Sequence, residues 1–328
     1  RLTDVTGVQT CALPIYTAQQ TLDFAQRLYE QHKLISYPRT ESRHLSEAMR
    51  GDLPLILKNA PEELRPLAKI AFFRLKDGHP LGKAYIDDKK LTDHHAIIPT
   101  MKRQEGPLEP ALANIYTLIQ KRFIAVFFAD FFENVTELTL VINQETFKFK
   151  GAIPTDLGWK EIYLQEEKGL PPEELAGLPL ADEAKAVLAR YPPRRECLAM
   201  LKAQFQEGQS CKIDALEIAE KETAPPKAYT DGTLLNAMRY IGRQVDDESL
   251  AKQLKDQGLG TQATRASIIE RLIKTQYVVR KGKNLHPTDK GIGLIETVIT
   301  DLKSPELTAQ WEIRLSEIQD GRLDPAVF

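Results

Sequence analysis

The sequence has few cysteines, no long hydrophobic run and almost no net charge. Its three cysteines, among 328 residues, form no CxxC pair, so neither a zinc site nor a disulfide framework is indicated, and a reducing cytosol fits. The longest apolar run, Phe123–Phe132, falls far short of the roughly 20 residues that span a bilayer and contains Asp130. No Walker-type ATP-binding loop occurs. These absences predict a cytoplasmic protein with no membrane partner and no use of ATP.

The charge is nevertheless unevenly distributed. A net charge of −2 excludes a polycation, so nucleic-acid binding would need a local basic patch. Between residues 262 and 290, seven lysines and arginines stand against two acidic residues, a local charge of +5. With 42% hydrophobic and 27% charged residues, the chain otherwise has the composition of an ordinary globular protein of one to three domains.

The first fifteen residues, RLTDVTGVQTCALPI, have neither a long apolar leader core nor a small-residue cleavage site. The stretch VTGVQTCALPI matches the translation of a common DNA-library sequencing adapter. We therefore interpret residues 1–15 as an artefact and leave them out of the fold prediction. On this interpretation the natural protein extends upstream and the chain is a fragment.

The first half of the remaining chain has helical periodicity. Thr17 to Gln20 form a capping-box pattern that predicts a helix over 17–32. Residues 46–76 are predicted helical with proline breaks, 91–100 extended, and 107–131 helical.

Beyond residue 132 the period changes to two. Residues 135–153 predict a β-hairpin that turns at Asn143–Glu145, and 211–220 predict a further strand. Residues 165–195, rich in Pro, Glu and Ala, predict an exposed insertion. This β-rich stretch separates two helical regions.

The last hundred residues begin after a linker at 224–227. They predict a helix capped by Thr230 or Asp231, a second helix after Gly258 and Gly260, a hairpin that turns at Lys281-Gly282, and helices from Asp289 and Pro305. A helix that leads into a two-stranded wing is the winged-helix arrangement, and here the wing is basic.

The stretch LISYPRTESRHLS at 34–46 contains the strongest chemical signal. A phenol of pKa about 10 attacks a phosphodiester only in a field that favours its ionised form, and an arginine fork is the natural partner for the phosphate oxygens. Tyr37-Pro38-Arg39 supplies both groups on a stiff, extended backbone. His94 is a candidate proton donor, and Thr40, Ser42 and Arg43 are candidate ligands of adjacent phosphates.

Each of these features also has an ordinary structural interpretation. A lone tyrosine is usually part of a core, a histidine pair is usually a surface pair, a glycine-rich loop before a helix is usually a cap, and a basic wing is usually a solvated face. The functional interpretation depends on all four occurring together and in this order.

Five motifs together resemble type IA DNA topoisomerases, most closely the bacterial topoisomerase III branch. They are YPRTESRHLS, LTDHHAIIPT, PPKAYTDGTLLNAM, GLGTQATRASIIERLIK with the wing KGKNLHPT, and LTAQWEIRLSEIQDG. The resemblance runs from about Thr17 to the end of the chain. It implies that Tyr37 is the nucleophile that becomes linked to a 5′ phosphate, that Arg39 positions the phosphate, and that His94 is the motif histidine beside the tyrosine. The single-stranded DNA would contact Thr40, Ser42, Arg43, His95, Thr261, Thr264, Arg265, Lys281 and Lys283.

The resemblance also implies an α+β multidomain fold, a torus in which winged-helix-like domains are joined by a β-rich arch. Residues 16–132 would form the tyrosine-bearing domain, 133–220 part of the arch, and 221–328 the truncated single-strand-binding domain. The family's first domain, with its acidic Mg²⁺ site and acid/base glutamate, has no match here, so the chain alone would bind single strands but relax no DNA. The family's usual residue at Gln262 is proline, a difference expected to have little effect. The parent enzyme would be a monomer associated with the nucleoid.

Two other classes are weaker. A non-catalytic winged-helix DNA-binding module explains the basic region equally well, but it does not explain the order of Tyr37, Arg39 and His94. A tyrosine recombinase would place its tyrosine late, after several arginines and histidines, whereas here the tyrosine comes first.

Overall fold

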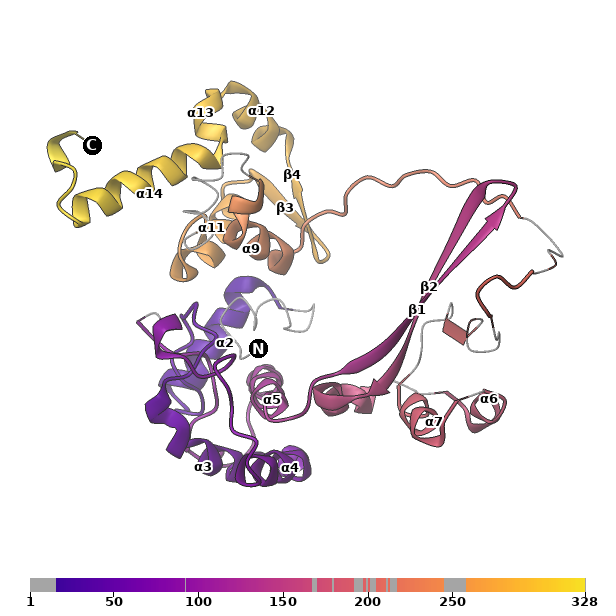
Figure 1. Ribbon diagram of the computed structural model, residues 1–328. Helices are drawn as coiled ribbons and strands as arrows, with labels where there is room; N and C mark the ends of the chain where they lie inside the picture. The colour runs from indigo at the N-terminus through magenta and orange to yellow at the C-terminus, as the bar shows by residue number, and fades with distance from the viewer. Residues whose placement is uncertain are drawn as a thin grey trace. The chain divides into compact units, whose positions relative to one another are not determined.

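The computed structural model describes residues 16–91, 93–166, 170–178, 180–191, 197–198, 200, 205–210, 212, 217–244 and 258–327 (Figure 1). The chain divides into two compact units. The tyrosine unit combines residues 1–61, 82–123 and 226–328, and the hairpin unit combines 62–81 and 124–225. Each contains helices and a two-stranded sheet, in agreement with the α+β class. The predicted boundaries at 132 and 220 stay a prediction.

The tyrosine unit is mainly helical. Its elements are α2 (Ala18–Glu30), η1 (Glu47–Gly51), α3 (Leu53–Lys58), η3 (Asp88–Lys90), α5 (Pro110–Ala125, which runs across the border), α9 (Asp231–Arg239), η5 (Ile241–Gln244), α11 (Gln262–Lys274), β3 (Val278–Lys281), β4 (Asn284–Pro287), α12 (Asp289–Thr297), α13 (Thr300–Lys303), α14 (Pro305–Gln319) and η6 (Pro325–Val327).

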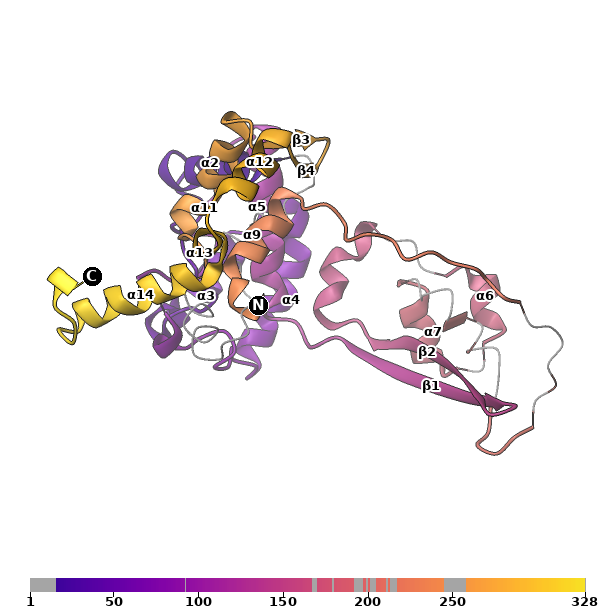
Figure 2. The same ribbon diagram turned by 90° about the horizontal axis from the view of Figure 1, so that it is seen from above.

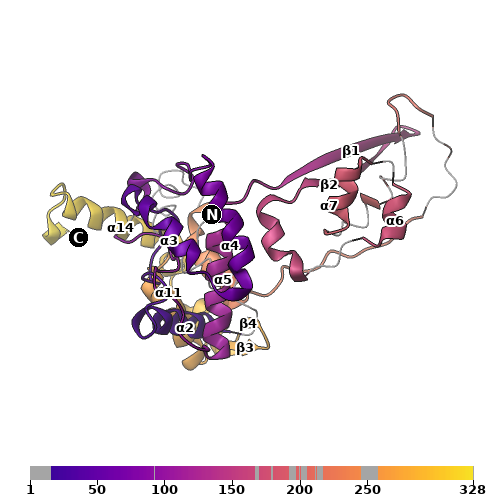
Figure 3. The same cartoon turned by 90° about the horizontal axis from the view of Figure 1, so that it is seen from below.

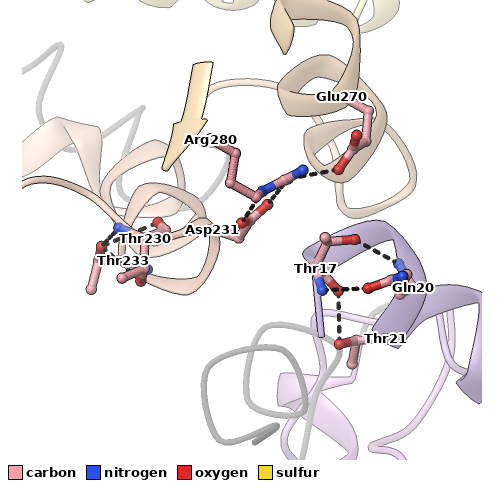
Figure 4. Close-up of polar contacts among 8 residues, drawn as sticks. All are labelled: Thr17, Gln20, Thr21, Thr230, Asp231, Thr233, Glu270 and Arg280. Atoms are coloured by element: carbon pink, nitrogen blue, oxygen red, sulfur yellow. Dashed lines mark hydrogen bonds and ion pairs between the residues drawn. The ribbon is translucent and has the colours of Figure 1, made fainter. Parts of the chain in front are cut away.

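The predicted capping box at the start of α2 is confirmed. The Thr17 hydroxyl accepts from the Gln20 amide at 3.1 Å, and the Gln20 side chain accepts from the Thr17 amide at 2.9 Å (Figure 4). Two of the unpaired N–H groups at the helix start are thereby satisfied. The apolar face behind the cap, including Leu22 and Leu28, is buried. This face anchors the segment that leads to Tyr37.

The core of the tyrosine unit joins the two ends of the sequence. Residues of α2 and α5 pack in one cluster with Leu235 of α9, Ile269 of α11 and Leu285 of β4. Figure 1 shows α2, in indigo, near the orange α9 and α11, and α2 and α11 are in contact. Among these helices, Tyr116 of α5 is buried, and burial raises the pKa of its phenol, so the ring is a neutral part of the core. This shared core holds the tyrosine segment together with α9, α11 and the β3–β4 hairpin.

The β3–β4 hairpin is fixed to the helices through its one inward-facing arginine. Arg280 donates two hydrogen bonds to Asp231, at 2.7 and 3.1 Å, and one to Glu270 at 2.8 Å (Figure 4). Partial burial lowers the pKa of Arg280, but the bonds to both carboxylates outweigh it, and the net shift is upward. The turn lies at Gly282-Lys283, one residue later than predicted, because Lys281 still pairs with Asn284.

The hairpin unit is built on one long antiparallel pair. Its elements are η2 (Glu62–Leu64), α4 (Arg65–Lys76), β1 (Phe132–Ile142), β2 (Glu145–Asp156), η4 (Gly158–Glu166), α6 (Pro172–Ala176) and α7 (Asp182–Leu188). Asn143 and Gln144 both have positive φ, as a two-residue turn of this twist requires. The predicted hairpin is confirmed, but its turn is only Asn143-Gln144, because Glu145 already pairs with Ile142. Figures 2 and 3 show α7 beside β2, and the two are in contact.

Two predictions for this unit need correction. Residues 165–195 are not simply an exposed insertion, because Leu175, Leu178 and Leu188 are buried together. The helix predicted to reach 131 ends at Ala125, where Phe127 and Phe128 bond to carbonyl groups only three residues back. The predicted strand at 211–220 lies partly outside the described residues, and 217–220 have no regular structure.

Candidate active site

Two extended segments lie side by side in the tyrosine unit and bring the predicted tyrosine and histidine together. The Ser36 amide donates to the Ile98 carbonyl at 2.9 Å, and the Ile98 amide donates to the Ser36 hydroxyl at 2.9 Å. The Thr100 amide donates to the Leu34 carbonyl at 2.9 Å. These bonds fix the register of residues 34–36 against 96–100. The pairing agrees with the prediction that 91–100 is extended, of which Thr92 lies outside the described residues.

The ring of Tyr37 contacts two other rings in this arrangement. The centroids of Tyr37 and His94 are 4.4 Å apart with an interplanar angle of 41°. Tyr37 also meets Tyr29 of α2 edge to face, at 5.5 Å and 80°. Tyr37 is half-buried and His94 exposed, so the phenol is held by its neighbours while the site stays open to solvent.

The loop that follows Tyr37 is braced by two buried hydroxyls. Thr40 donates to the His94 carbonyl at 3.3 Å and accepts from the Ser42 amide at 3.1 Å. The Ser42 hydroxyl accepts from the His44 amide at 3.2 Å. The sequence predicts Thr40 and Ser42 at the DNA surface, whereas the structure buries both side chains and uses them to hold the loop beside His94. Their predicted contact with DNA is untested.

The predicted cationic ligands differ in how accessible they are. Arg39 is exposed, and within the described part of the chain it has no ion pair. Lys281 and Lys283 are exposed at the tip of the β3–β4 hairpin. Arg43 is half-buried. His95 is also half-buried, and its Nδ1 lies 2.8 Å from the Ala96 carbonyl, which orients the ring along the backbone. Arg39, Lys281 and Lys283 are thus the side chains best placed to meet an anion.

Arg265 has a different place from the one predicted. Its side chain is 2% exposed, and its Nη1 lies 2.8 Å from Oε1 of Glu41, four residues after Tyr37. It also donates to the carbonyls of Leu259 and Gly260, at 3.0 and 2.8 Å. Arg239 donates to the Glu41 carbonyl at 3.4 Å. The Glu41–Arg265 pair therefore links the tyrosine loop to the start of α11.

The glycine-rich loop before α11 has the predicted form. Gly258 and Gly260 have φ of +68° and +66°. A Cβ at Gly258 would lie 2.8 Å from the carbonyl oxygens of Met238 and Arg239, so only glycine fits that turn without a shift. Thr261 and Thr264 cap the helix, with the Thr261 amide donating to the Thr264 hydroxyl at 2.9 Å. Both threonines are exposed, so they stay compatible with contact to a DNA backbone.

Gln262 stands where the family resemblance implies proline, and its surroundings bear on the expectation that this difference has little effect on the helix cap. It occupies the first position of α11, and its side-chain oxygen and nitrogen are buried with no hydrogen-bond partner among the described residues. A buried unpaired amide is destabilising, and proline is favoured at a first helical position, where its missing N–H is not needed.

We therefore expect Gln262→Pro to increase the free energy of unfolding by about 1–2 kcal/mol. Thr261, with φ −97° and ψ 168°, already has a backbone that tolerates a following proline. Thermal unfolding of the two proteins measures the effect. A lower melting temperature for the proline variant would contradict the expectation.

Tyr29 and Glu41 belong to the site although the sequence does not single them out. Tyr29 falls on the apolar spacing of its helix and is therefore expected in the core, and Glu41 has the pattern of a surface acid. No motif could have paired Glu41 with an arginine more than two hundred residues away. Only the shared core of the tyrosine unit brings them together.

Two features are absent from the described residues, a cluster of metal ligands and a helix that could span a membrane. No three His, Cys, Asp or Glu side chains there are grouped so that they could hold a metal ion. No helix in the described ranges is long and apolar enough to cross a membrane.

Comparison with known proteins identifies the family. The family model for DNA topoisomerase matches residues 4–328, which includes part of the segment interpreted as adapter. DNA topoisomerase 3 of Bacillus licheniformis is 38% identical over 319 residues, and that of Bacillus subtilis 37% over 319, each alignment covering 95% of this chain. The chain spans about 40% of the length of these relatives.

A solved structure shares the fold. Full-length topoisomerase I from Thermotoga maritima superposes with a TM-score of 0.58 at 22% sequence identity, covering 97% of this chain and 46% of that one. At this identity the likeness supports the architecture and not the assignment of individual residues.

Proposed function

This chain belongs to the DNA topoisomerase family, as a type IA, topoisomerase III-like member, and we propose that it carries the nucleophile with which such an enzyme cleaves and rejoins one DNA strand. The observation that carries the proposal is the packing of Tyr37 against His94, with ring centroids 4.4 Å apart and Arg39 exposed two residues further on. A nucleophile, a phosphate-binding cation and a proton donor are thus present on one open surface.

The reaction is a transesterification. The phenolic oxygen of Tyr37 attacks the phosphorus, the bond from phosphorus to the 3′ oxygen breaks, and the phenolic proton is lost while the leaving oxygen gains one. The product is a 5′-phosphotyrosine and a free 3′ hydroxyl. Because one phosphate ester replaces another, the 3′ hydroxyl can reverse the step without ATP.

The residues around Tyr37 have separate tasks in this proposal. Arg39 neutralises the charge that spreads over the non-bridging oxygens. His94 donates a proton to a phosphate oxygen or to the leaving oxygen. The buried Thr40 and Ser42 keep the loop against the His94 backbone. Lys281, Lys283, Thr261 and Thr264 contact the backbone of the single strand farther from the break.

The described residues do not fit a divalent metal, so no step above is assigned to one. Type IA topoisomerases generally need such an ion. We propose that Mg²⁺ binds to the family's first domain, in the part of the relatives' length that this chain does not span. On its own the chain then binds single-stranded DNA without relaxing it.

The finer architecture belongs to the same proposal. In this proposal the enzyme is a torus, with residues 133–220 in a β-rich arch and 221–328 in a winged-helix-like domain. It is a monomer and acts on nucleoid DNA in the cytoplasm. A purely binding winged-helix module gains no support, since the family match extends over the tyrosine segment as well as the wing.

Covalent trapping tests the function. A fusion of this chain to the first domain of the Bacillus subtilis relative is incubated with Mg²⁺ and a single-stranded oligonucleotide, then denatured. A 3′-end label should remain on the protein, and a 5′-end label should appear in a shorter free strand. A 5′ label on the protein would indicate the opposite linkage, as in tyrosine recombinases. Label on neither, with a fusion shown to be folded and to bind the oligonucleotide, would refute strand cleavage.

A further inference from the structure

Three residues after the end of α2, Lys33 has a left-handed backbone. Lys33 has φ +58°, a region that side chains with a Cβ occupy at a cost and that glycine usually fills after a helix. The conformation is fixed on both sides, because the Leu34 amide donates to the Leu28 carbonyl at 3.0 Å and the Thr100 hydroxyl donates to the Lys33 carbonyl at 2.7 Å. The turn itself would form more easily with glycine, so the lysine side chain is the part that needs an explanation.

That side chain contacts one of the aromatic rings at the candidate site. The amine of Lys33 lies 5.5 Å from the ring centroid of Tyr29, within the range of a cation–π contact. Tyr29 in turn meets the ring of Tyr37 edge to face. Lys33 is exposed, and among the residues that the structure describes it has no ion pair. The strained turn therefore places an accessible positive charge next to the tyrosine that supports the nucleophile.

We propose that Lys33 is a phosphate-binding residue of the cleavage site, and that Tyr29 positions it. Lys33 contacts the phosphate next to the one that Tyr37 attacks, while Arg39 contacts the attacked phosphate itself. The ammonium group is a compact point charge, which suits one phosphate oxygen at the edge of a site. This inference rests on the proposed function, because it requires a DNA strand at Tyr37.

The chain contains a matched control for the backbone. Gln276, after α11, has φ +63°, and its carbonyl accepts from the Thr288 hydroxyl at 2.7 Å, while the next amide, Tyr277, donates back to the Leu272 carbonyl at 3.0 Å. Gln276 shares with Lys33 the positive φ and a carbonyl that accepts from a threonine hydroxyl, although the returning amide bonds five residues back here and six at Lys33. The Gln276 side chain carries no charge. Replacing each residue with glycine relieves the same strain, and only one replacement removes a cation.

The experiment measures binding of a fluorescent single-stranded oligonucleotide to this chain at several salt concentrations, together with thermal unfolding. Both Lys33→Gly and Gln276→Gly should raise the melting temperature by about 1–3 °C. Lys33→Gly should weaken DNA binding by about three- to tenfold and reduce the slope of log affinity against log salt by about 0.7, as for one lost contact to a single strand. Lys33→Arg should retain both, and Lys303→Gln, at an exposed lysine of α13, should leave both unchanged.

The outcomes separate the two proposals. Wild-type affinity and salt slope in Lys33→Gly, from a chain that does bind the oligonucleotide, would overturn the role of Lys33 and leave the proposed function standing. An equal loss of binding in Gln276→Gly would show that the turn matters and not the charge, and would also overturn it. No binding of single strands by the wild-type chain would count against both proposals.

Discussion

Replacing Tyr37 with phenylalanine should abolish covalent transfer to DNA and leave single-strand binding within about twofold. In the proposed reaction the phenolic oxygen forms the new bond, so its loss should lower the rate of adduct formation by roughly 10⁴ or more. The ring remains, and the ring makes the contacts with Tyr29 and His94. The variant should therefore fold and bind as before.

The measurement is the end-label trapping assay on the fusion protein, with binding of the same oligonucleotide followed in parallel. Tyr16→Phe is the control, because it removes a phenolic oxygen of the same unit that, among the described residues, accepts one hydrogen bond, from Asn114 at 3.2 Å. The control should form adduct at the wild-type rate. Undiminished adduct in Tyr37→Phe would place the nucleophile elsewhere and remove the main support for the assignment.

Local patterns in the sequence were sufficient for most individual elements. Four such elements depend on residues within a few positions of one another. They are the capping box at Thr17, the turn at Asn143, the glycine turn before α11 and the basic β3–β4 hairpin. Such elements can be predicted because their causes, namely caps, positive φ and alternation, lie inside the segment itself.

The features that could not be predicted depend on contacts between distant segments. Thr40 and Ser42 have the residue types of a phosphate-binding loop, yet both are buried, because the loop packs on the 94–96 backbone. The leucines of 165–195 lie in a polar stretch without clear periodicity, yet they form a small core. Thr40 and Ser42 are covered by a segment more than fifty residues away, and the leucines by one another and their neighbours, so packing and not local composition decides burial in both cases.

Arg265 is the strongest example of burial decided by packing, and it gives the second large prediction. Its side chain is 2% exposed, and its Nη1 lies 2.8 Å from Oε1 of Glu41. Replacing Glu41 with glutamine keeps the shape of this partner but removes its negative charge from beside the buried cation. Loss of one partner of a buried pair is strongly destabilising, here by about 3 kcal/mol.

Hydrogen exchange of the α11 amides is the suitable measurement, because it reports the opening free energy of the region that Arg265 holds. Glu109→Gln is the matched control. Glu109 pairs with Arg27 at the same 2.8 Å, but the two side chains are 50% and 39% exposed. An exposed pair of this kind should contribute less than about 1 kcal/mol.

A double-mutant cycle decides whether the charge is the cause. Arg265→Met removes the buried cation, and Glu41, which is 29% exposed, then keeps access to water. If the pair is what stabilises α11, adding Glu41→Gln to Arg265→Met should change its opening free energy little, with a coupling energy of about 2 kcal/mol. Additive losses would mean that Glu41 acts without Arg265. Because Glu41 follows Tyr37 by four residues, a coupled pair would also mean that α11 and the Tyr37 loop keep their mutual position through this contact.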